Sequence, residues 1–334
     1  MPADQYAADP AGSDRPGPYG FLGPEGSFAH AAAQNLVAEL PGGPARLIAC
    51  ASVAEAVDAV RAGAVAGAVV PLENSVEGSV AATLDELAEL SPLVIAAESY
   101  LPVVFDLLAR PGTRPADIGT VATHPHAAAQ VRRYLLTELP AARLIPVDST
   151  AAGARAVADG GYDAAVAPAA AGRRYRLASL ATDIADRPGA VTRFVLVRRP
   201  VAPPPPTGAD RTTLVAYPRS DRAGALLEIL AEFAGRGVNL TRIESRPTKD
   251  QLGRYCFSID CAGSVADARV GDALAALHRL CAEVRYLGSY PQGSLPGRDR
   301  RPEAVPAGRT DAEFAEAAGW LARVRTTGTG AADA

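Results

Sequence analysis

The sequence predicts an α/β region followed by a smaller α+β domain of the ferredoxin-like class. Between residues 19 and 197, short apolar runs typical of strands alternate with segments of helical periodicity, as expected for mostly parallel sheets. Residues 201–208 include four consecutive prolines, which favour a stiff, extended spacer. After the spacer the expected order is β-α-β-β-α-β, which is typical of a split βαβ fold. A chain of 334 residues is long enough for roughly two or three domains.

The composition argues against several classes of function. The formal net charge of −4 gives no global attraction to nucleic acid or to an anionic membrane, and no apolar run is long enough to span a bilayer. Residues 1–17 lack the basic start and apolar core of a secretory signal, so we expect a disordered N-terminus and a cytoplasmic protein. The four cysteines match no zinc-binding spacing and the four histidines are scattered, so we expect buried free thiols and no metal site.

The stretch at residues 69–79 is the most informative part of the α/β region. Residues 66–70 form an apolar run that predicts a buried strand, and Pro71 is expected to end it because proline has no N–H for a ladder bond. Three adjacent polar side chains follow, Glu73, Asn74 and Ser75. From Gly78 onward the apolar residues recur at helical spacing. Ligands of open α/β sheets bind between strand end and helix start, although an ordinary polar loop fits the same pattern.

The other elements of this region follow from the same two periodicities. Strands are expected at residues 19–22, 93–97, 101–109, 121–123, 144–147, 164–167 and 190–197, and helices after Ser27, Ser52, Pro125 and Ser149. Four strand-to-helix turns carry hydroxyl or amide side chains: Ser27; Asn74, Ser75 and Ser79; Thr123; and Ser149 with Thr150. Helix starts that point into one cleft would bind an anion, although each of these side chains also suits a simple helix cap.

The ferredoxin-like domain is assigned to residues 211–291. Its strands are expected at residues 212–217, 238–245, 255–261 and 284–290, with helices at 225–235 and 270–281. Helices cover one face of such a sheet, and the open face or an edge is suited to pairing with a second copy of the chain. In the polar tail, residues 292–334, we expect one short amphipathic helix from Asp311 to Val324.

Several segments match one protein family. They are residues 19–28 (YGFLGPEGSF), residues 70–80 (VPLENSVEGSV), Thr123-His124-Pro125 with Gln130, Thr192-Arg193-Phe194, Gly224-Ala225-Leu226 and Glu244-Ser245-Arg246-Pro247. A single tripeptide would be weak evidence, whereas all of these segments in this order are highly specific. Over residues 19–291 the chain therefore resembles monofunctional prephenate dehydratases with a C-terminal ACT regulatory domain.

The resemblance implies a fold and a division into domains. The dehydratase part would be a two-lobe α/β domain, like a periplasmic binding protein, with the site in the cleft, followed by a ferredoxin-like α+β ACT domain. The implied bounds are 18–199 for the dehydratase domain, with lobe 1 at 18–95 and 180–199 and lobe 2 at 96–179, and 200–210 for the linker. The chain would cross between the lobes near Ala97 and near Leu180, and we expect the lobes to close on substrate.

The resemblance also implies a reaction, the conversion of the dianion prephenate to phenylpyruvate with joint loss of the ring hydroxyl and CO2. This carbon–oxygen lyase would need no cofactor, but it must hydrogen-bond the leaving hydroxyl and hold both carboxylates. Thr192 would be the donor closest to the leaving group, and Arg193 would grip a carboxylate, unless it forms a supporting salt bridge. The other implied catalytic residues are Glu73, Asn74, Thr123 and Gln130, and the implied substrate-binding residues are Ser27, Ser75, Ser79, Ser149, Thr150 and Phe194.

The chain departs from the family pattern at several places in the expected cleft. Residues 168–177 lack a usual acid and gain arginines, and a usual asparagine is absent near Gly189. Two alternatives therefore stay open. One is a prephenate decarboxylase with a non-aromatic product, against which the retained Thr192 and the ACT domain argue. The other is a non-catalytic amino-acid sensor, against which residues 73–75 and 192–194 argue. We expect His124 to be structural rather than a proton relay.

The resemblance finally implies allosteric control by L-phenylalanine in a homodimer or homotetramer. Gly224 precedes a helix whose free N–H groups suit the carboxylate of an amino acid. The implied phenylalanine-binding residues are Gly224, Ala225, Leu226, Asn239, Leu240, Glu244, Ser245, Arg246 and Pro247. The same residues would also fit a role limited to the contact between two ACT domains. The expected partners are thus prephenate, phenylalanine and further copies of the chain.

Overall fold

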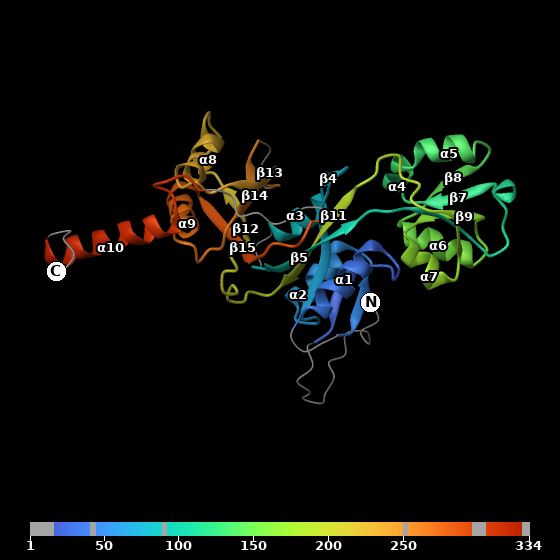
Figure 1. Ribbon diagram of the computed structural model, residues 1–334, viewed down its shortest axis with the longest axis horizontal. Helices are drawn as coiled ribbons and strands as arrows, with labels where there is room; N and C mark the ends of the chain where they lie inside the picture. The colour runs from blue at the N-terminus through green and yellow to red at the C-terminus, as the bar shows by residue number, and fades with distance from the viewer. Residues whose placement is uncertain (1–16, 41–44, 89–91, 250–252, 296–304, 329–334) are drawn as a thin grey trace. The chain divides into compact units, whose positions relative to one another are not determined.

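The computed structural model of the chain describes residues 17–40, 45–88, 92–249, 253–295 and 305–328 (Figure 1). It contains two compact units, of which the first holds residues 17–88 and 98–199 and the second holds residues 92–97, 200–294 and 305–328. Apart from Gly17, the N-terminal segment for which we expect disorder lies outside the described residues. In the described parts of the chain no helix has the length and apolar composition needed to cross a membrane.

The first lobe of the first unit is a mixed sheet with helices. Its strands lie in the order β2 (Leu47–Cys50), β1 (Tyr19–Leu22), β3 (Gly67–Asn74), β11 (Val191–Arg198) and β5 (Val94–Pro102), and the short β4 (Gly78–Ser79) pairs with β3. Its helices are α1 (Phe28–Ala38), α2 (Val53–Arg61) and α3 (Ala81–Leu87). β1 is parallel to β2 and β3, whereas β11 is antiparallel to β3. Most apolar residues of β3 and β11 are buried, among them Val69, Val70 and residues 194–197, so these two strands form the centre of the lobe.

The strand that carries the polar stretch is longer than expected. Pro71 does not end it, because β3 continues to Asn74 before the chain turns back into β4. A shift in the pairing with β11 makes Leu72 the extra residue of a β-bulge, and proline is tolerated at bulges because no regular ladder bond is lost there. The hydroxyl of Thr83 donates to the Pro71 carbonyl at 2.6 Å and holds α3 against the bulge.

This extension decides which polar side chains face each other. Beyond the bulge, Glu73 lies opposite Arg193 and Asn74 lies opposite Thr192. The helix expected from Gly78 onward begins only at Ala81, after the strand β4. The polar stretch is therefore a hairpin between β3 and β4 rather than a strand-to-helix turn.

The second lobe is built on a separate sheet. Its strands lie in the order β10 (Ala178–Ala181), β6 (Asp106–Ala109), β9 (Ala164–Ala167), β7 (Thr120–Thr123) and β8 (Arg143–Pro146). Its helices are α4 (Pro125–Gln130), α5 (Arg132–Glu138), α6 (Thr150–Ala158) and α7 (Ala169–Tyr175), with a 3-10 turn at Pro115–Asp117. β7 is parallel to β8 and β9, and β6 is antiparallel to its two neighbours. Gly153 lets α6 approach β7 closely, because a Cβ there would lie 3.0 Å from the Ala122 carbonyl.

The expected two-lobe α/β architecture is confirmed, but the crossings lie later in the chain than expected. β5 extends through Pro102, so the chain reaches the second lobe at residues 103–105 rather than near Ala97. It returns between β10 and β11 through residues 182–190. The N–H of Val103 donates to the carbonyl of Ala190 at 2.7 Å, so the two crossing segments are bonded to each other.

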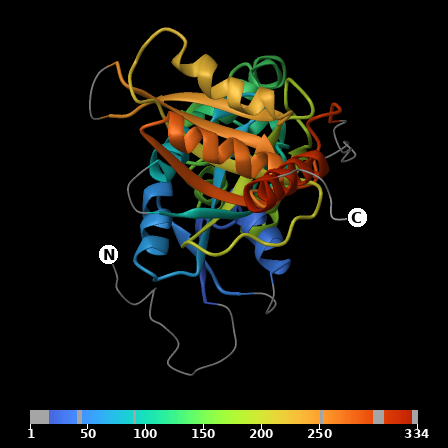
Figure 2. The same ribbon diagram turned by 90° about the vertical axis from the view of Figure 1, so that its left-hand side faces the viewer.

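The second unit has the expected ferredoxin-like order. Its elements are β12 (Asp210–Tyr217), α8 (Ala225–Gly235), β13 (Leu240–Pro247), β14 (Tyr255–Ala262), α9 (Ala268–Leu280) and β15 (Glu283–Pro291). The antiparallel sheet has the order β13-β14-β12-β15, and α8 and α9 lie together on one face (Figure 2). Leu214 and Ile259 of the sheet pack there against Phe233 and Leu277 of the helices. The tail helix α10 (Asp311–Thr327) begins with a capping box and runs slightly beyond the expected end.

Candidate active site

The ends of β3 and β11 bring Asn74 against Thr192. The side-chain nitrogen of Asn74 donates to the hydroxyl oxygen of Thr192 at 2.8 Å. The amide cannot be turned over, because its oxygen accepts the backbone N–H groups of Val76 at 2.8 Å and Glu77 at 3.0 Å. The Thr192 oxygen is thus an acceptor in this pair, and its own O–H can donate to a bound molecule. This geometry suits the donor role that the family resemblance implies for Thr192.

Ser75 joins the same two strand ends. Its N–H donates to the carbonyl of Val191 at 2.9 Å, and its hydroxyl oxygen accepts the N–H of Val191 at 2.9 Å. The Ser75 hydroxyl also acts as an acceptor here and has a proton to donate outward. Ser75 is exposed whereas Thr192 is buried. One exposed and one buried hydroxyl donor therefore lie where the β3–β4 hairpin meets β11.

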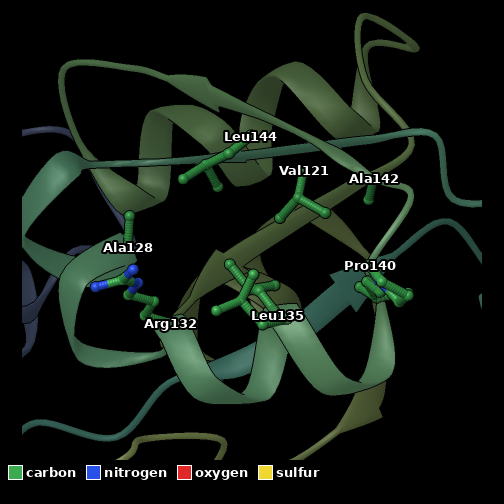
Figure 3. Close-up of a pocket in the computed structure, with 9 residues that line it drawn as sticks. Val121, Ala128, Arg132, Leu135, Pro140, Ala142 and Leu144 are labelled. Atoms are coloured by element: carbon green, nitrogen blue, oxygen red, sulfur yellow. The ribbon is translucent and has the colours of Figure 1, made fainter.

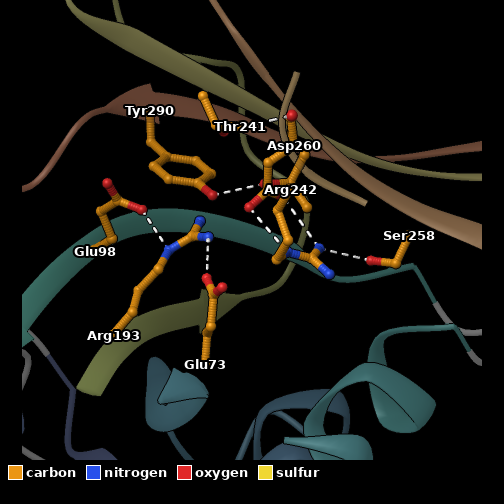
Figure 4. A network of polar contacts seen from close by, with 9 residues as sticks. Glu73, Glu98, Arg193, Thr241, Arg242, Ser258, Asp260 and Tyr290 are labelled. Carbon is orange, nitrogen blue, oxygen red and sulfur yellow. Dashed lines mark hydrogen bonds and ion pairs between the residues drawn. The ribbon is translucent and has the colours of Figure 1, made fainter. Parts of the chain in front are cut away.

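Arg193 lies on the other face of β11, because consecutive side chains of a strand point to opposite sides. Its side chain is 2% exposed and its Nε lies 2.7 Å from the Glu98 carboxylate, whose side chain is fully buried. A guanidinium nitrogen lies 3.9 Å from the carboxylate of Glu73, which is 40% exposed (Figure 4). These contacts favour the supporting salt bridge over a grip on a carboxylate of the substrate.

Glu98 was not predicted as a site residue. A signal was present, since Glu98 is a carboxylate that follows four apolar residues in a strand, and such a charge is rarely buried without a partner. Its partner could not be identified, because Arg193 is distant in the sequence and lies next to Glu98 only once β5 and β11 are neighbours in the sheet.

Side-chain contacts join the two lobes within the first unit. Gln130 of α4 donates to the Glu77 carboxylate at 3.4 Å, so this predicted residue reaches the hairpin that holds Asn74. Glu25, in the turn after β1, forms an ion pair with Arg174 of α7. The hydroxyl of Tyr175 donates to the Glu25 carbonyl at 3.0 Å. The arginine-rich departure from the family pattern therefore supplies a contact between the lobes.

Several of the predicted substrate-binding hydroxyls have local structural partners. Ser27 and Ser149 each accept the backbone N–H three residues further on, at 3.2 and 3.0 Å, as N-caps of α1 and α6. Thr123 is fully buried and donates its hydroxyl to the Val166 carbonyl at 2.7 Å. Of the remaining predicted residues, Thr150 and Phe194 are buried, and Ser79 lies in β4 opposite Glu73.

His124 caps α4, since its ring nitrogen Nδ1 accepts the N–H of His126 at 3.3 Å. Burial lowers the pKa of His124 below its usual value, and the neighbouring His126 lowers it further. The ring is therefore neutral at pH 7, as an acceptor in a helix cap requires. This agrees with the structural role expected for His124.

A small apolar cavity in the second lobe lies between α5 and the strands β7 and β8 (Figure 3). Its volume is about 160 Å³, and Arg132 is the charged residue among those lining it. None of the predicted site residues lines this cavity. Within the described ranges, no three His, Cys, Asp or Glu side chains converge as metal ligands would.

The residues predicted to bind phenylalanine lie at the start of α8 and along β13, except for Asn239, which directly precedes β13. Gly224 is the N-cap of α8 with φ of +85°, a left-handed conformation that favours glycine. β13 is an edge strand of its sheet. Leu227 of α8 is 70% exposed and Ile243 of β13 is 42% exposed, so both elements present apolar surface. Arg242 of β13 is instead buried, bonded to Asp260 and Ser258 of β14 (Figure 4).

Comparison with known proteins gives consistent matches. The family model described as prephenate dehydratase matches residues 19–202, and the ACT domain model matches residues 219–279. A prephenate dehydratase from Mycobacterium sp. (strain KMS) is 47% identical over 312 residues, which cover 91% of this chain and 95% of that protein. The crystal structure of an Arthrobacter aurescens prephenate dehydratase in complex with L-Phe is similar with a TM-score of 0.83, 47% identity, and coverage of 92% and 99%. A structure described as a quorum-quenching acylase is similar with a TM-score of 0.72, 30% identity, and coverage of 82% and 97%.

Proposed function

Because the chain belongs to the prephenate dehydratase family and carries an ACT domain, we propose that it converts prephenate to phenylpyruvate in phenylalanine biosynthesis, under control of L-phenylalanine. The observation that carries the proposal is the Asn74–Thr192 pair, which presents a hydroxyl proton at the end of β11. A second observation is the neighbouring Ser75 hydroxyl, which is engaged as an acceptor in the same way.

The reaction requires one donor at the leaving oxygen. The bond between the ring and its carboxylate breaks, CO2 leaves, and the electron pair enters the ring as the C–O bond to the hydroxyl breaks. The departing oxygen takes up negative charge, and the Thr192 O–H stabilises it by a hydrogen bond. The Asn74 amide donates to the Thr192 oxygen and so makes the Thr192 proton a stronger donor. Aromatisation of the ring supplies the driving force, and no cofactor takes part.

The carboxylates of the substrate need neutral donors in this arrangement. Ser75 lies in the β3–β4 hairpin, and Gln130 of α4 reaches the same hairpin from the second lobe. Both side chains can donate hydrogen bonds to carboxylate oxygens of the substrate. The buried Arg193 could turn to a carboxylate only by leaving Glu98, which would strand a buried charge at a cost of about 3–5 kcal/mol. We therefore assign Arg193 to the support of β11.

Control by phenylalanine is proposed to act through paired ACT domains. The N–H groups at the start of α8 suit the carboxylate of the amino acid, and the exposed Leu227 and Ile243 suit burial against a second copy. A homo-oligomer is therefore the proposed assembly. Activity would change because ACT pairs with bound phenylalanine favour one arrangement of the two lobes. The coupling between phenylalanine binding and the lobe arrangement is reciprocal.

An assay of the purified protein with prephenate tests the function. We expect phenylpyruvate to form, and phenylalanine to change the rate. Release of CO2 with a non-aromatic product would favour the decarboxylase, and phenylalanine binding without turnover would favour the sensor. Hydrolysis of an acylated substrate with no turnover of prephenate would assign this chain the activity printed for its acylase relative.

A further inference from the structure

Glu98 is a deeply buried charge that takes no part in the bond changes of the reaction. Its side chain is fully buried in β5, and its carboxylate lies 2.7 Å from Nε of Arg193 in β11, which is 2% exposed. Burying both charges has a large desolvation cost, so such a pair is weak evidence for stability by itself. The position of the pair in the sheet gives it another consequence.

The pair lies beside an irregularity in the pairing of β3 with β11. Leu72 is the extra residue of the β3 bulge, and Pro71 beside it has no N–H to donate. Beyond the bulge, the pairing of β3 with β11 is limited to Glu73 and Asn74, the last two residues of β3, and to the bonds between Ser75 and Val191. A slip of one residue in so short a segment would turn Thr192 to the opposite face.

We propose that Glu98 is a positioning residue, which acts through Arg193 to fix the register of β11 and thereby the direction of the Thr192 hydroxyl. Arg193 contacts Glu98 of β5 on one side and Glu73 of β3 on the other, so one guanidinium links three neighbouring strands at the bulge (Figure 4). The link lies on the face of β11 opposite Thr192 and needs no contact with substrate. The inference rests on the proposed function.

The test compares two substitutions that each neutralise the carboxylate of an ion pair in the first lobe. Glu98→Gln removes the charge next to Arg193 and keeps the shape. Glu86→Gln is the matched control, because Glu86 contacts Arg61 at the same 2.7 Å on the helical side of the lobe, with side chains 18% and 15% exposed. We expect Glu98→Gln to lower kcat on the order of 10–100-fold with KM for prephenate within about threefold, as for a misplacement of roughly 1 Å. We expect Glu86→Gln to lower the melting temperature without changing kcat.

Two further results separate positioning from general stability. If Glu98 acts through Arg193, the double variant Glu98→Gln/Arg193→Gln loses no more kcat than Arg193→Gln alone. Unchanged kcat in Glu98→Gln, or losses that multiply in the double variant, would overturn the proposal. If Glu98→Gln does not fold, Glu98→Asp carries the same test, since it keeps the charge but withdraws it by one methylene. A lowered kcat at unchanged KM is again expected, and a kcat equal to wild type would overturn it.

Hydrogen exchange keeps the inference separable from the proposed function. If the wild-type protein does not turn over prephenate, the proposed function is wrong. Hydrogen exchange then tests the positioning role of Glu98 independently of activity. We expect the backbone amides of residues 191–193 to exchange faster in Glu98→Gln than in Glu86→Gln at equal global stability. Equal exchange rates at these amides would overturn the positioning role, whatever the activity.

Discussion

The side-chain nitrogen of Asn74 lies 2.8 Å from the hydroxyl oxygen of Thr192, across two antiparallel strands and 118 residues of sequence. The pair fixes a direction for protons. Backbone N–H groups hold the amide oxygen, so the amide nitrogen must donate and the Thr192 hydroxyl must point its proton elsewhere. Thr192 is therefore suited to stabilise a departing oxygen rather than to act as a base.

Removing the Thr192 hydroxyl should abolish most of the activity. Thr192→Val keeps the shape of the side chain and removes the donor, so we expect kcat to fall about 10²–10³-fold with a smaller change in KM. Thr192→Ser keeps the hydroxyl and should stay within about tenfold of wild type. Steady-state kinetics with prephenate measure both variants. Equal losses in the two variants would show that the hydroxyl is not the group that matters.

Reversing the donor at position 74 should also impair the reaction. Asn74→Asp keeps the shape and both bonds to the N–H groups of Val76 and Glu77, but it replaces the donor with an acceptor. The Thr192 hydroxyl would then donate to the new carboxylate and would no longer be directed to the substrate. We expect kcat to fall about 10–100-fold while the melting temperature changes little. Full activity in this variant would contradict the proton directions assigned to the pair.

The neutral cap formed by His124 should make stability depend on pH. Burial lowers the pKa of His124 in the folded state, so above the unfolded value of about 6.5 the ring is neutral in both states and costs nothing. As the pH falls below that value, the unfolded chain takes up the proton first, and the folded state loses stability. His124→Asn keeps a helix cap without a titrating group. We expect its melting temperature to fall less between pH 7.5 and 5.5 than that of wild type, and an identical fall would contradict the assignment.

The glycine at the start of α8 should be required for the phenylalanine response. Gly224→Val places a β-branched side chain at φ of +85°, a strain of about 1–2 kcal/mol, although a Cβ there meets open space. We expect phenylalanine to bind more weakly by calorimetry and to change activity less. Gly235→Ala is the matched control, because Gly235 ends the same helix without a left-handed φ and a Cβ added there meets open space. An unaltered phenylalanine response in Gly224→Val would remove the site from this position.

Local patterns predicted those parts of the fold that depend on neighbours in the sequence. Ser27, Ser52 and Ser149 cap helices as expected, because a cap needs only a hydroxyl and the N–H three residues further on. The ferredoxin-like order followed from alternating periodicities in the same way. α7 was not expected, because its sequence begins with three alanines and a glycine and has no apolar period.

Features that depend on pairing between distant strands could not be predicted. Pro71 has the same missing N–H in any sequence, but whether it ends a strand or occupies a bulge depends on the register with β11. Thr192 and Arg193 are adjacent in the sequence and were both assigned to substrate, yet the alternation of β11 places them on opposite faces. Glu98 became visible as the partner of Arg193 only when the order of the strands was known.

A crystal structure with an unreactive analogue of prephenate tests the central claim most directly. We expect the ring hydroxyl of the analogue to lie about 2.7–3.0 Å from the Thr192 hydroxyl oxygen, with its carboxylates near Ser75 and Gln130. An analogue bound in the apolar cavity of the second lobe, or with its hydroxyl out of reach of Thr192, would contradict the account.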